Sequence, residues 1–354
     1  MTIQVKALAE RANDYEALRA YHRGDVVLRN KPKILAIEGT NFCNVKCIMC
    51  PRGEPDIMKR EIGHMDREIF QRVLDQAEFF VDPCWLHWFG EPLMNPEIFS
   101  FIDLAKTKIP NVGISTNATL LTQERARKLL DTGLDTIIVA IDGATAESYE
   151  RIRKSDRFSF EIVQRNARFF IEERNRRGQK KPHIILSSIA MQETQDELDA
   201  YTKSWKEAGA DEVLIKTMTA WGDQTDDFQK LLTDSRAEQL RQPRQNPCLH
   251  MWQSLIVAWD GRVVPCCYDY DAKVPLGDLR TQTLEEIWNG PAYVEFRRAE
   301  LEGRNDTELC RNCTDAPSLK RDPNFGKGIS RGRTDYLLDK SLARVKRLWE
   351  ALPV

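Results

Sequence analysis

The sequence predicts an α/β fold, a parallel sheet curled into a partial (β/α)6 TIM-like barrel, followed by a small C-terminal domain of different construction. Six short apolar segments alternate with helical patterns, and this order stops near residues 234–245. Strands that are each followed by a helix pair in parallel, and six such units make an incomplete version of the eight-fold barrel. With 354 residues and 42% hydrophobic content, the chain can form both domains.

The elements follow in order from the N-terminus. Residues 1–32 are predicted to form an extension that contains an amphipathic helix, and residues 33–233 to form the barrel. The predicted strands are KILAIEGT (33–40), CWLHWFGE (84–91), NVGISTNA (111–118), TIIVAIDG (136–143), HIILSSIAM (183–191) and DEVLIKTM (211–218). Helical patterns such as REIFQRVLDQAEFF (67–80) and QERARKLLDTG (123–133) fill the gaps.

The C-terminal domain is placed at residues 246–316. Its segment WQSLIVAWDGRVVPCCYD (252–269) predicts a β-hairpin around the Asp260–Gly261 turn. The next segment, TLEEIWNGPAYVEFRRAEL (283–301), predicts a helix that is interrupted near Gly290–Pro291. The tail, residues 317–354, is predicted to end in an amphipathic helix.

Charge and hydropathy limit the possible partners. The formal net charge is −2, which gives no reason to expect a nucleic-acid partner. We find neither a signal-peptide core nor about 18 uncharged apolar residues in a row, so the sequence predicts no membrane partner and a cytoplasmic location. In that reducing compartment the nine cysteines indicate metal binding rather than disulfides.

Cys43, Cys47 and Cys50 lie at a C-x3-C-x2-C spacing in FCNVKCIMC (42–50), directly after the first predicted strand. The active-site loops of a parallel barrel lie at this end of the strands. Three thiolates can hold three irons of a [4Fe–4S] cluster and leave the fourth iron open. A structural zinc site would need a fourth ligand, and the nearest downstream candidate, His64, lies beyond a loop.

This cysteine loop resembles the signature of the radical S-adenosylmethionine (radical SAM) superfamily, with Met49 at its apolar position. A second segment, FGEPLMNP (89–96), resembles the GGEP motif of the same family through Gly90, Glu91 and Pro92. The resemblance implies that S-adenosylmethionine binds the open iron and is cleaved to a 5′-deoxyadenosyl radical. A GEP triplet alone is equally typical of an ordinary strand-to-loop turn.

Further cofactor contacts follow from the same resemblance. Asp142 falls where relatives bind a ribose hydroxyl, although Ala140 replaces a frequent serine two residues earlier. Arg153 falls where relatives pair with the methionine carboxylate, for which arginine suits bidentate binding; a surface arginine is the alternative. Asn117 and Gln192 are weaker ribose or methionine candidates.

A second group of cysteines follows the barrel: Cys248, Cys266, Cys310 and Cys313, spaced C-x17-C-x43-C-x2-C. Spacing alone leaves zinc and a fully ligated [4Fe–4S] cluster open. The segment resembles the SPASM/twitch branch of the superfamily, and its spacings resemble those of the aminocyclitol dehydrogenases. The resemblance, which covers about residues 33 to 316, implies one auxiliary [4Fe–4S] cluster.

Cys267 is the spare cysteine of this second group, because family spacing favours Cys266 as the ligand. The resemblance implies a catalytic role in which a free thiol donates a hydrogen atom to a substrate radical, as in radical SAM sugar and aminocyclitol epimerases. The alternative is a buried inert thiol that packs as a small apolar side chain. Cys84 is interpreted as such a core thiol.

The sequence therefore indicates a radical SAM enzyme that abstracts hydrogen from a carbinol carbon of a sugar or aminocyclitol, with epimerisation through Cys267 as the first hypothesis. Dehydrogenation to a ketone, with the auxiliary cluster as electron acceptor, is one alternative. Peptide or protein modification by a SPASM maturase is another, and a non-enzymatic scaffold a third. The expected partners are a polar small-molecule substrate and an external electron donor such as flavodoxin or ferredoxin.

Three polar residues lie on otherwise apolar predicted strands: Glu38, His87 and Lys216. A strand buried on both faces should be nearly continuously apolar, so these residues are predicted to bind the substrate in the barrel lumen. Each of them has the alternative of a buried polar residue with its hydrogen bonds satisfied by the protein. Trp221 and Tyr268 are candidates for the wall of a sugar site, although aromatic residues are more often part of a core.

Overall fold

The computed structural model describes residues 3–155, 158–219, 221, 226–240, 246–303, 309, 310, 313, 319–322 and 325. Its strands form one sheet in the order β6-β5-β4-β3-β2-β1-β7-β8-β9. The first six are β1 (Lys33–Ile37), β2 (Phe79–Trp85), β3 (Val112–Thr116), β4 (Thr136–Ala140), β5 (His183–Ala190) and β6 (Glu212–Thr217). Each pairs in parallel with the next, which confirms the predicted α/β fold.

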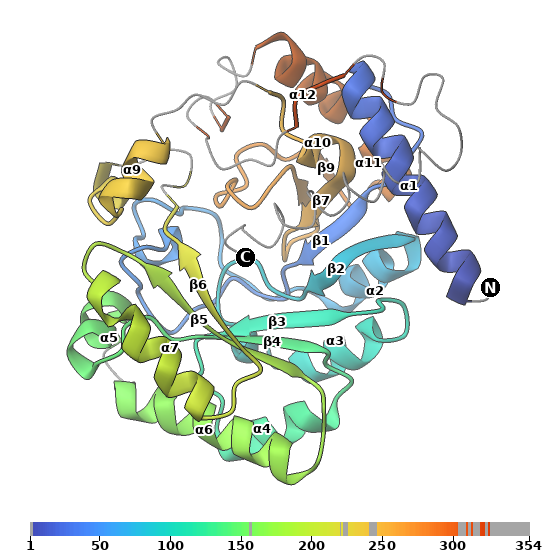
Figure 1. Cartoon of the computed structure of the whole chain (residues 1–354). Coiled ribbons are helices and arrows are strands. Elements are labelled where there is room, and N and C mark those ends of the chain that lie inside the picture. The colour runs from blue at the N-terminus through green and yellow to red at the C-terminus, as the bar shows by residue number, and fades with distance from the viewer. Residues whose placement is uncertain are drawn as a thin grey trace.

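The helices of the barrel lie on the outer side of this curved sheet (Figure 1). They are α2 (Arg67–Gln76), α3 (Ile98–Ala105), α4 (Gln123–Asp131), α5 (Ala146–Arg153), α6 (Phe160–Arg176) and α7 (Leu198–Glu207). Two short helices, α8 (Asp226–Gln229) and α9 (Asp234–Leu240), follow β6. The strands and their helices thus form the partial barrel that the alternating pattern predicts.

Register divides the side chains of the sheet into an outer and an inner set, because successive residues of a strand face opposite sides. The outer set includes Ile114, Ile137 and Ile184, which are fully buried. The inner set follows from the pairs Trp85↔Gly113, Gly113↔Thr136, Ala140↔Ser187 and Ile189↔Lys216. The inner set includes Lys216 of β6 and, continued past the strand ends, His87, Asn117 and Asp142.

The second strand lies earlier than predicted. The sequence indicates a strand over residues 84–91, whereas β2 spans Phe79–Trp85 and α2 ends at Gln76. Periodicity alone does not separate a short apolar run in a helix from one in a strand, so the pattern predicts Phe79 and Phe80 in the helix, whereas they begin β2. Residues 86–91 form the loop after β2, which carries His87 and the GEP segment.

The C-terminal domain continues the same sheet. β7 (Ser254–Val257) pairs in parallel with β1, and β8 (Arg262–Val264) and β9 (Gly277–Asp278) add antiparallel strands. The β7–β8 pair confirms the predicted hairpin around Asp260–Gly261. The interrupted helix is also confirmed, as α11 (Leu284–Trp288) and α12 (Pro291–Glu302).

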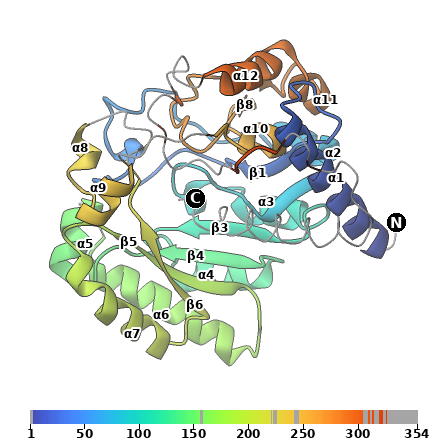
Figure 2. The same ribbon diagram turned by 45° about the horizontal axis from the view of Figure 1, so that its top comes forward.

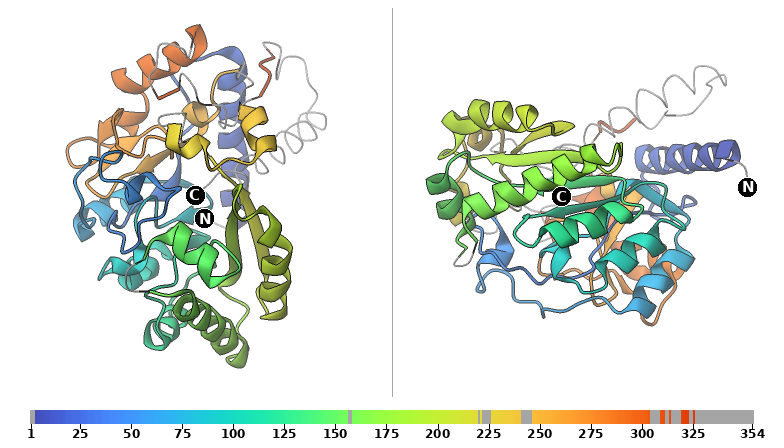
Figure 3. Two further views of the ribbon diagram at one scale, coloured as in Figure 1. Left: turned by 90° about the vertical axis from the view of Figure 1, so that its left-hand side faces the viewer. Right: turned by 90° about the horizontal axis from the view of Figure 1, so that it is seen from below.

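The N-terminal helix α1 (Ile3–Arg23) packs on this domain rather than on the barrel helices (Figure 2). Tyr21 stacks edge-on against Trp252 of α10 (His250–Gln253), with ring centroids 5.4 Å apart, and its hydroxyl donates to the Pro247 carbonyl. Figure 3 shows the other end of α1 projecting from one edge of the molecule. The predicted C-terminal helix lies outside the described residues.

Within the described part of the chain, the model contains no helix with the length and apolar character needed to cross a membrane.

Candidate active site at two groups of cysteines

Cys43, Cys47 and Cys50 lie on the loop between β1 and the short helix η1 (Pro51–Gly53). The loop turns back on itself, because the Cys50 N–H donates to the Cys47 carbonyl at 3.1 Å and the Gly53 N–H donates to the Cys50 carbonyl at 2.8 Å. A Cβ at Gly53 would meet the Cys47 carbonyl at 2.5 Å. The tight turn therefore brings the three thiols together and requires glycine at its end.

Burial raises the pKa of all three thiols above the ordinary value, and the pKa of Cys50 reaches about 12. Charge on Cys47 raises the pKa of both other thiols further, so the three sulfurs lie close to one another. Such thiols become thiolates when a metal takes the place of the proton. Three neighbouring thiols on one loop, with Cys47 buried and the other two partly buried, fit a [4Fe–4S] cluster with one open iron.

Arg153 connects the first cysteine group to the inner face of the sheet. Its guanidinium Nη1 donates to Cys47 Sγ at 3.4 Å, and Nη2 lies 2.7 Å from Asp142 Oδ2. Asp142 Oδ1 accepts from the Ile189 N–H at 2.8 Å. The structure thus brings Asp142 and Arg153 together as a buried ion pair beside Cys47. Their predicted contacts to ribose and methionine stay predictions.

The GEP segment packs directly on the cysteine loop. The Glu91 N–H donates to the Phe42 carbonyl at 2.7 Å, and Gly90 has φ +87°, with space for a Cβ blocked by the backbone of Asn41 and Phe42. The Glu91 carboxylate accepts from Thr116 Oγ1 and the Asn117 N–H, each at 2.7 Å. Glu91 therefore connects the end of β3 to the cysteine loop. Pro92 begins the short helix η2 (Pro92–Met94) behind it.

The remaining predicted cofactor residues differ in position. Asn117 Nδ2 lies 4.0 Å from Cys43 Sγ and donates to Asn44 Oδ1 at 3.0 Å, so it borders the first cysteine group. Met49 is buried, and its carbonyl accepts from the Trp221 indole at 2.9 Å. Gln192 is exposed at the end of β5; its role stays a prediction.

Trp221 is the centre of an aromatic wall that spans the two domains. Its ring lies 5.5 Å from Phe89, 5.8 Å from Tyr268 and 6.4 Å from Tyr270, measured between centroids. Phe89 belongs to the loop after β2, and the two tyrosines follow the hairpin. The wall therefore joins the first cysteine loop to the C-terminal domain, and all four rings are buried.

The four cysteines of the second group line one cavity. Cys248, Cys266, Cys310 and Cys313 share it with Cys267 and His250. Burial raises the pKa of Cys266, and charge on each of the other four cysteines raises it further. The cysteines separated by up to 65 positions in the sequence are thus gathered around one space, as a shared metal centre requires.

Among the residues that the structure describes, no three Cys, His, Asp or Glu side chains converge on a single ion position. Zinc holds its sulfur ligands about 2.3 Å from one point, whereas the thiolates of an iron–sulfur cluster each bind a different iron.

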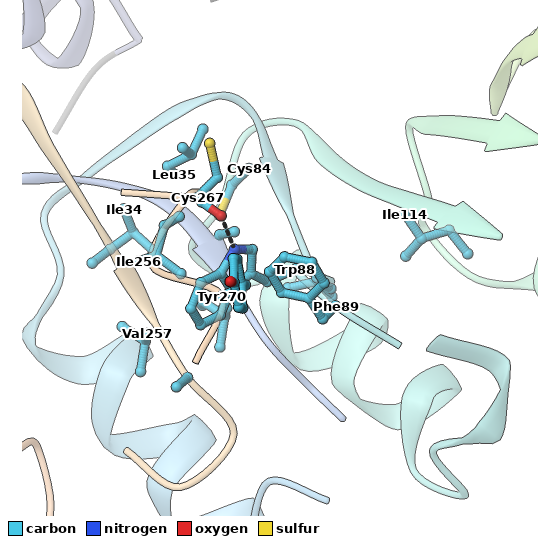
Figure 4. Close-up of a cluster of buried hydrophobic side chains, with 14 of the residues drawn as sticks. Ile34, Leu35, Cys84, Trp88, Phe89, Ile114, Ile256, Val257, Cys267 and Tyr270 are labelled. Carbon is cyan, nitrogen blue, oxygen red and sulfur yellow. Dashed lines mark hydrogen bonds between the residues drawn. The ribbon is translucent and has the colours of Figure 1, made fainter. Parts of the chain in front are cut away.

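Cys267 lies in the wall between this cavity and the barrel. Its side chain is buried, and its carbonyl accepts from the Trp88 indole at 3.1 Å. Figure 4 shows the carbonyl directed at Trp88, with Phe89 and Tyr270 beside that ring. The hairpin of the C-terminal domain thus contacts the loop that carries His87. The role of Cys267 as a hydrogen donor stays a prediction. Cys84 is fully buried in β2.

Glu38 has all its hydrogen bonds supplied by the protein. Its two oxygens accept from both terminal nitrogens of Arg60 and from the N–H groups of Phe89 and Trp259, and Arg60 stacks on Trp88. This geometry favours the alternative interpretation of Glu38, a buried structural carboxylate. Sequence reasoning missed Arg60, because its partner lies 22 positions away and nothing in the local pattern marks it.

His87 and Lys216 both lie on the inner side of the sheet, at the ends of β2 and β6. His87 Nδ1 accepts from the Ser115 N–H at 3.1 Å, while Nε2 is buried without a partner among the described residues. Burial, reinforced by the charge of Lys216, lowers the pKa of His87 to about 3. Burial also lowers the pKa of Lys216, to about 8; the Asp142 charge opposes this, and the Arg153 charge reinforces it.

Three inner-face residues, His87, Asp142 and Lys216, therefore share one region with Arg153 of α5. Sequence reasoning missed the other polar residues of this face, Ser115 and Ser187. Their signal is a polar residue at alternate positions of an apolar strand, but only the register with the neighbouring strands assigns them to the inner side.

Two family models match the chain. The model of the radical SAM superfamily covers residues 37–185, and that of the SPASM iron–sulfur cluster-binding domain covers residues 248–314. Together they span more than half of the sequence, and each contains one cysteine group. The chain belongs to the radical SAM superfamily. It is a radical SAM enzyme of the SPASM branch.

Several relatives align over most of the chain, among them the following two. A Pyrococcus furiosus tungsten-containing aldehyde ferredoxin oxidoreductase cofactor-modifying protein is 23% identical over 300 residues, 75% of this chain and 83% of the relative. An S-adenosyl-L-methionine-dependent 2-deoxy-scyllo-inosamine dehydrogenase of Niallia circulans is 22% identical over 290 residues, 79% and 92% of the two chains.

Solved structures share the fold. BtrN in complex with AdoMet and 2-DOIA has a TM-score of 0.51 at 20% identity, over 82% of this chain and 97% of that chain. SuiB of Streptococcus suis, bound to the precursor peptide SuiA, has a TM-score of 0.61 at 14% identity, over 82% and 72%. The partial barrel with a C-terminal SPASM domain is therefore the fold of this radical SAM enzyme.

The cofactors follow from the two domains. S-adenosylmethionine and one [4Fe–4S] cluster belong to the radical SAM domain, and an auxiliary iron–sulfur cluster belongs to the SPASM domain. The thiols around Cys47 and the cysteine-lined cavity are the donor sets that fit these two clusters.

Proposed function

We propose that this radical SAM enzyme dehydrogenates a hydroxyl-bearing carbon of an aminocyclitol or sugar to a ketone. The observation that carries the proposal is the hydrogen bond from Trp88 to the Cys267 carbonyl. It puts the cysteine-lined cavity next to the loop that carries His87, and hence next to the polar inner face of the barrel. An electron acceptor adjacent to the substrate is what oxidation of a substrate radical needs.

The residues proposed for cofactor binding divide between the two domains. Cys43, Cys47 and Cys50 would hold the first cluster, and Cys248, Cys266, Cys310 and Cys313 the auxiliary one. When bound, S-adenosylmethionine and the first cluster supply the hydrogen-abstracting radical, and the auxiliary cluster supplies an acceptor for one electron. Around S-adenosylmethionine, the proposed contacts are those of the GEP segment, Met49, Asn117, Asp142, Arg153 and Gln192.

The residues that we propose to act on the substrate lie in the barrel lumen. Removing two hydrogens from a carbinol releases a hydroxyl proton, which needs an acceptor. Lys216 has a pKa near 8, so a substantial fraction of its amines are neutral at physiological pH and can take that proton.

The dehydrogenase relative supports oxidation, because it aligns over nearly its full length with this chain. Epimerisation is a second candidate, favoured by one observation: Cys267 is a fifth cysteine on a cavity whose cluster needs four. If Cys267 donates a hydrogen atom to the opposite face of the substrate radical, the product is inverted rather than oxidised. Peptide modification has no comparable support from this chain's own residues.

The test is product analysis in D2O. Enzyme reconstituted without oxygen is incubated with S-adenosylmethionine, dithionite and a panel of aminocyclitols and sugars that includes 2-deoxy-scyllo-inosamine. We expect a ketone, two mass units lighter than its substrate, and the same ketone from the Cys267→Ala variant. An inverted product carrying one deuterium, absent in Cys267→Ala, would replace oxidation with epimerisation. Modification of a peptide added to the same assay, with every panel member left unchanged, would contradict both.

Sustained turnover also needs an external reductant to start the radical reaction. We propose a flavodoxin or a ferredoxin for this role, as partners of the intact enzyme.

A further inference from the structure

His87 occupies the inner face of the barrel at the end of β2, at the level where Ser115 of β3 lies beside it. Its Nδ1 accepts the Ser115 backbone N–H at 3.1 Å. A ring nitrogen that accepts an N–H carries no proton of its own. Since burial keeps the ring neutral, the single ring proton lies on Nε2.

The Nε2–H group has no acceptor within the described protein. His87 is only 5% exposed, and Nε2 is buried without a hydrogen-bond partner. Leaving a donor buried and unpaired costs free energy, and native proteins rarely do so without a reason. An acceptor atom from outside the chain would remove this cost.

The neighbouring carboxylate is not that acceptor. Asp142 shares the inner face, but its Oδ1 accepts the Ile189 N–H and its Oδ2 pairs with Arg153. The other charged groups facing this region, Lys216 and Arg153, carry donors when protonated. An oxygen atom of a ligand that enters here can accept a hydrogen bond from the Nε2–H group.

We infer that His87, in the Nε2–H tautomer, is the hydrogen-bond donor that recognises one oxygen of the substrate, a hydroxyl that becomes a carbonyl. This inference rests on the proposed function, because it takes the substrate to be a polyol. A hydroxyl and a ketone oxygen both accept a hydrogen bond, so the contact is kept from substrate to product. His87 is thus a specificity-determining residue of the barrel lumen.

Two variants of His87 distinguish the acceptor role of Nδ1 from the donor role of Nε2. In His87→Asn, the amide oxygen reaches the position of Nδ1 and keeps the acceptor for Ser115, but no donor reaches the position of Nε2. In His87→Gln, the longer side chain puts an amide NH2 at the position of Nε2. His87→Asn therefore removes the donor and His87→Gln restores it, and both variants carry an amide side chain.

The readout is binding rather than turnover. The dissociation constant of 2-deoxy-scyllo-inosamine, and of the other members of the panel, is measured calorimetrically with the reconstituted enzyme and S-adenosylmethionine, without reductant. We expect His87→Asn to weaken binding roughly tenfold and His87→Gln to restore most of it, the effect of one hydrogen bond. The affinity for S-adenosylmethionine should not change in either variant.

The outcomes are distinguishable. If the wild-type enzyme binds a panel member and His87→Asn binds it equally well, the inference about His87 is wrong while the proposed function stands. If the wild-type enzyme binds no panel member, the proposed substrate class is wrong, and the inference falls with it. A matched analogue without the reacting hydroxyl should bind wild-type and His87→Asn enzymes equally; a difference between them would contradict the assigned contact.

Discussion

Lys216 projects from the inner face of β6, where two opposing charges act on it. Burial and the charge of Arg153 lower the pKa of Lys216 to about 8, although the charge of Asp142 raises it. A lysine on an edge strand is also a common device against edge-to-edge pairing, and β6 is an edge of the sheet. The lowered pKa favours a role inside the lumen, because a lysine that only protects an edge stays solvated and charged.

The lowered pKa of Lys216 has a measurable consequence for the stability of the protein. In the unfolded chain a lysine titrates near 10.4, so between about pH 8 and 10.4 the unfolded state binds the proton that the folded state has lost. The contribution of Lys216 to stability therefore rises with pH through this window and is least favourable below pH 8. We expect Lys216→Met to raise the thermal midpoint at pH 7 and to reduce the slope between pH 8 and 10.4, measured without oxygen.

The control is Lys31→Met, which alters an exposed lysine paired with Glu78. Surface pairs contribute little to stability, so its pH profile should follow that of the wild type. A Lys216→Met profile with the wild-type slope would show that Lys216 is not desolvated in the folded state.

The loop after β2 is the element on which both parts of the site depend. Gly90 touches the cysteine loop, Glu91 holds the end of β3, and Trp88 contacts the hairpin of the SPASM domain. Arg60 reinforces it, because the carboxylate of Glu38 binds both Arg60 and the Phe89 N–H. The first cluster, the lumen and the auxiliary cavity are thus positioned by one segment.

Gly90→Ala tests this element. Gly90 has φ +87°, and an added Cβ would lie 2.6 Å from the Phe42 carbonyl, so the GEP loop and the cysteine loop must move apart. We expect the affinity for S-adenosylmethionine to fall about tenfold or more, equivalent to roughly 1.4 kcal/mol, with a lower iron content. Equilibrium dialysis and iron analysis measure the two effects.

Gly178→Ala is the matched control. Gly178 also has positive φ, at +65°, but no atom lies within 4 Å of its Cβ position. This variant should cost only the backbone strain, about 1–2 kcal/mol of stability, and bind S-adenosylmethionine as the wild type does. An equal loss of affinity for S-adenosylmethionine in both variants would mean that the close approach at Gly90 has no special role.

At the scale of the whole molecule, local patterns predicted most of the architecture. The βα alternation, the Asp260–Gly261 turn and the Gly290–Pro291 break are local signals, and each appears in the structure. The position of β2 was not predictable in this way, because Phe79 and Phe80 suit a helix face as well as a strand. The cysteine groups were predictable since their spacing is itself the signal.

The inner face of the barrel was only partly predictable. A polar residue on an apolar strand marks a candidate, as for His87 and Lys216, but its partners come from other strands. Arg60 satisfies Glu38 from a loop, and Ser115 fixes the tautomer of His87 from the neighbouring strand. Such contacts depend on register and loop path, which local sequence does not encode.

We expect the two cysteine groups to hold two separate iron–sulfur clusters, one of which binds S-adenosylmethionine. The most direct measurement is iron and sulfide analysis with EPR spectra of the reduced enzyme, with and without S-adenosylmethionine. We predict about eight irons per chain, falling to about four when either cysteine group is replaced by alanine. Only the Cys43, Cys47 and Cys50 cluster should respond to S-adenosylmethionine. About four irons plus one zinc in the wild-type enzyme would contradict the account, because the cavity beside Trp88 would then hold no electron acceptor.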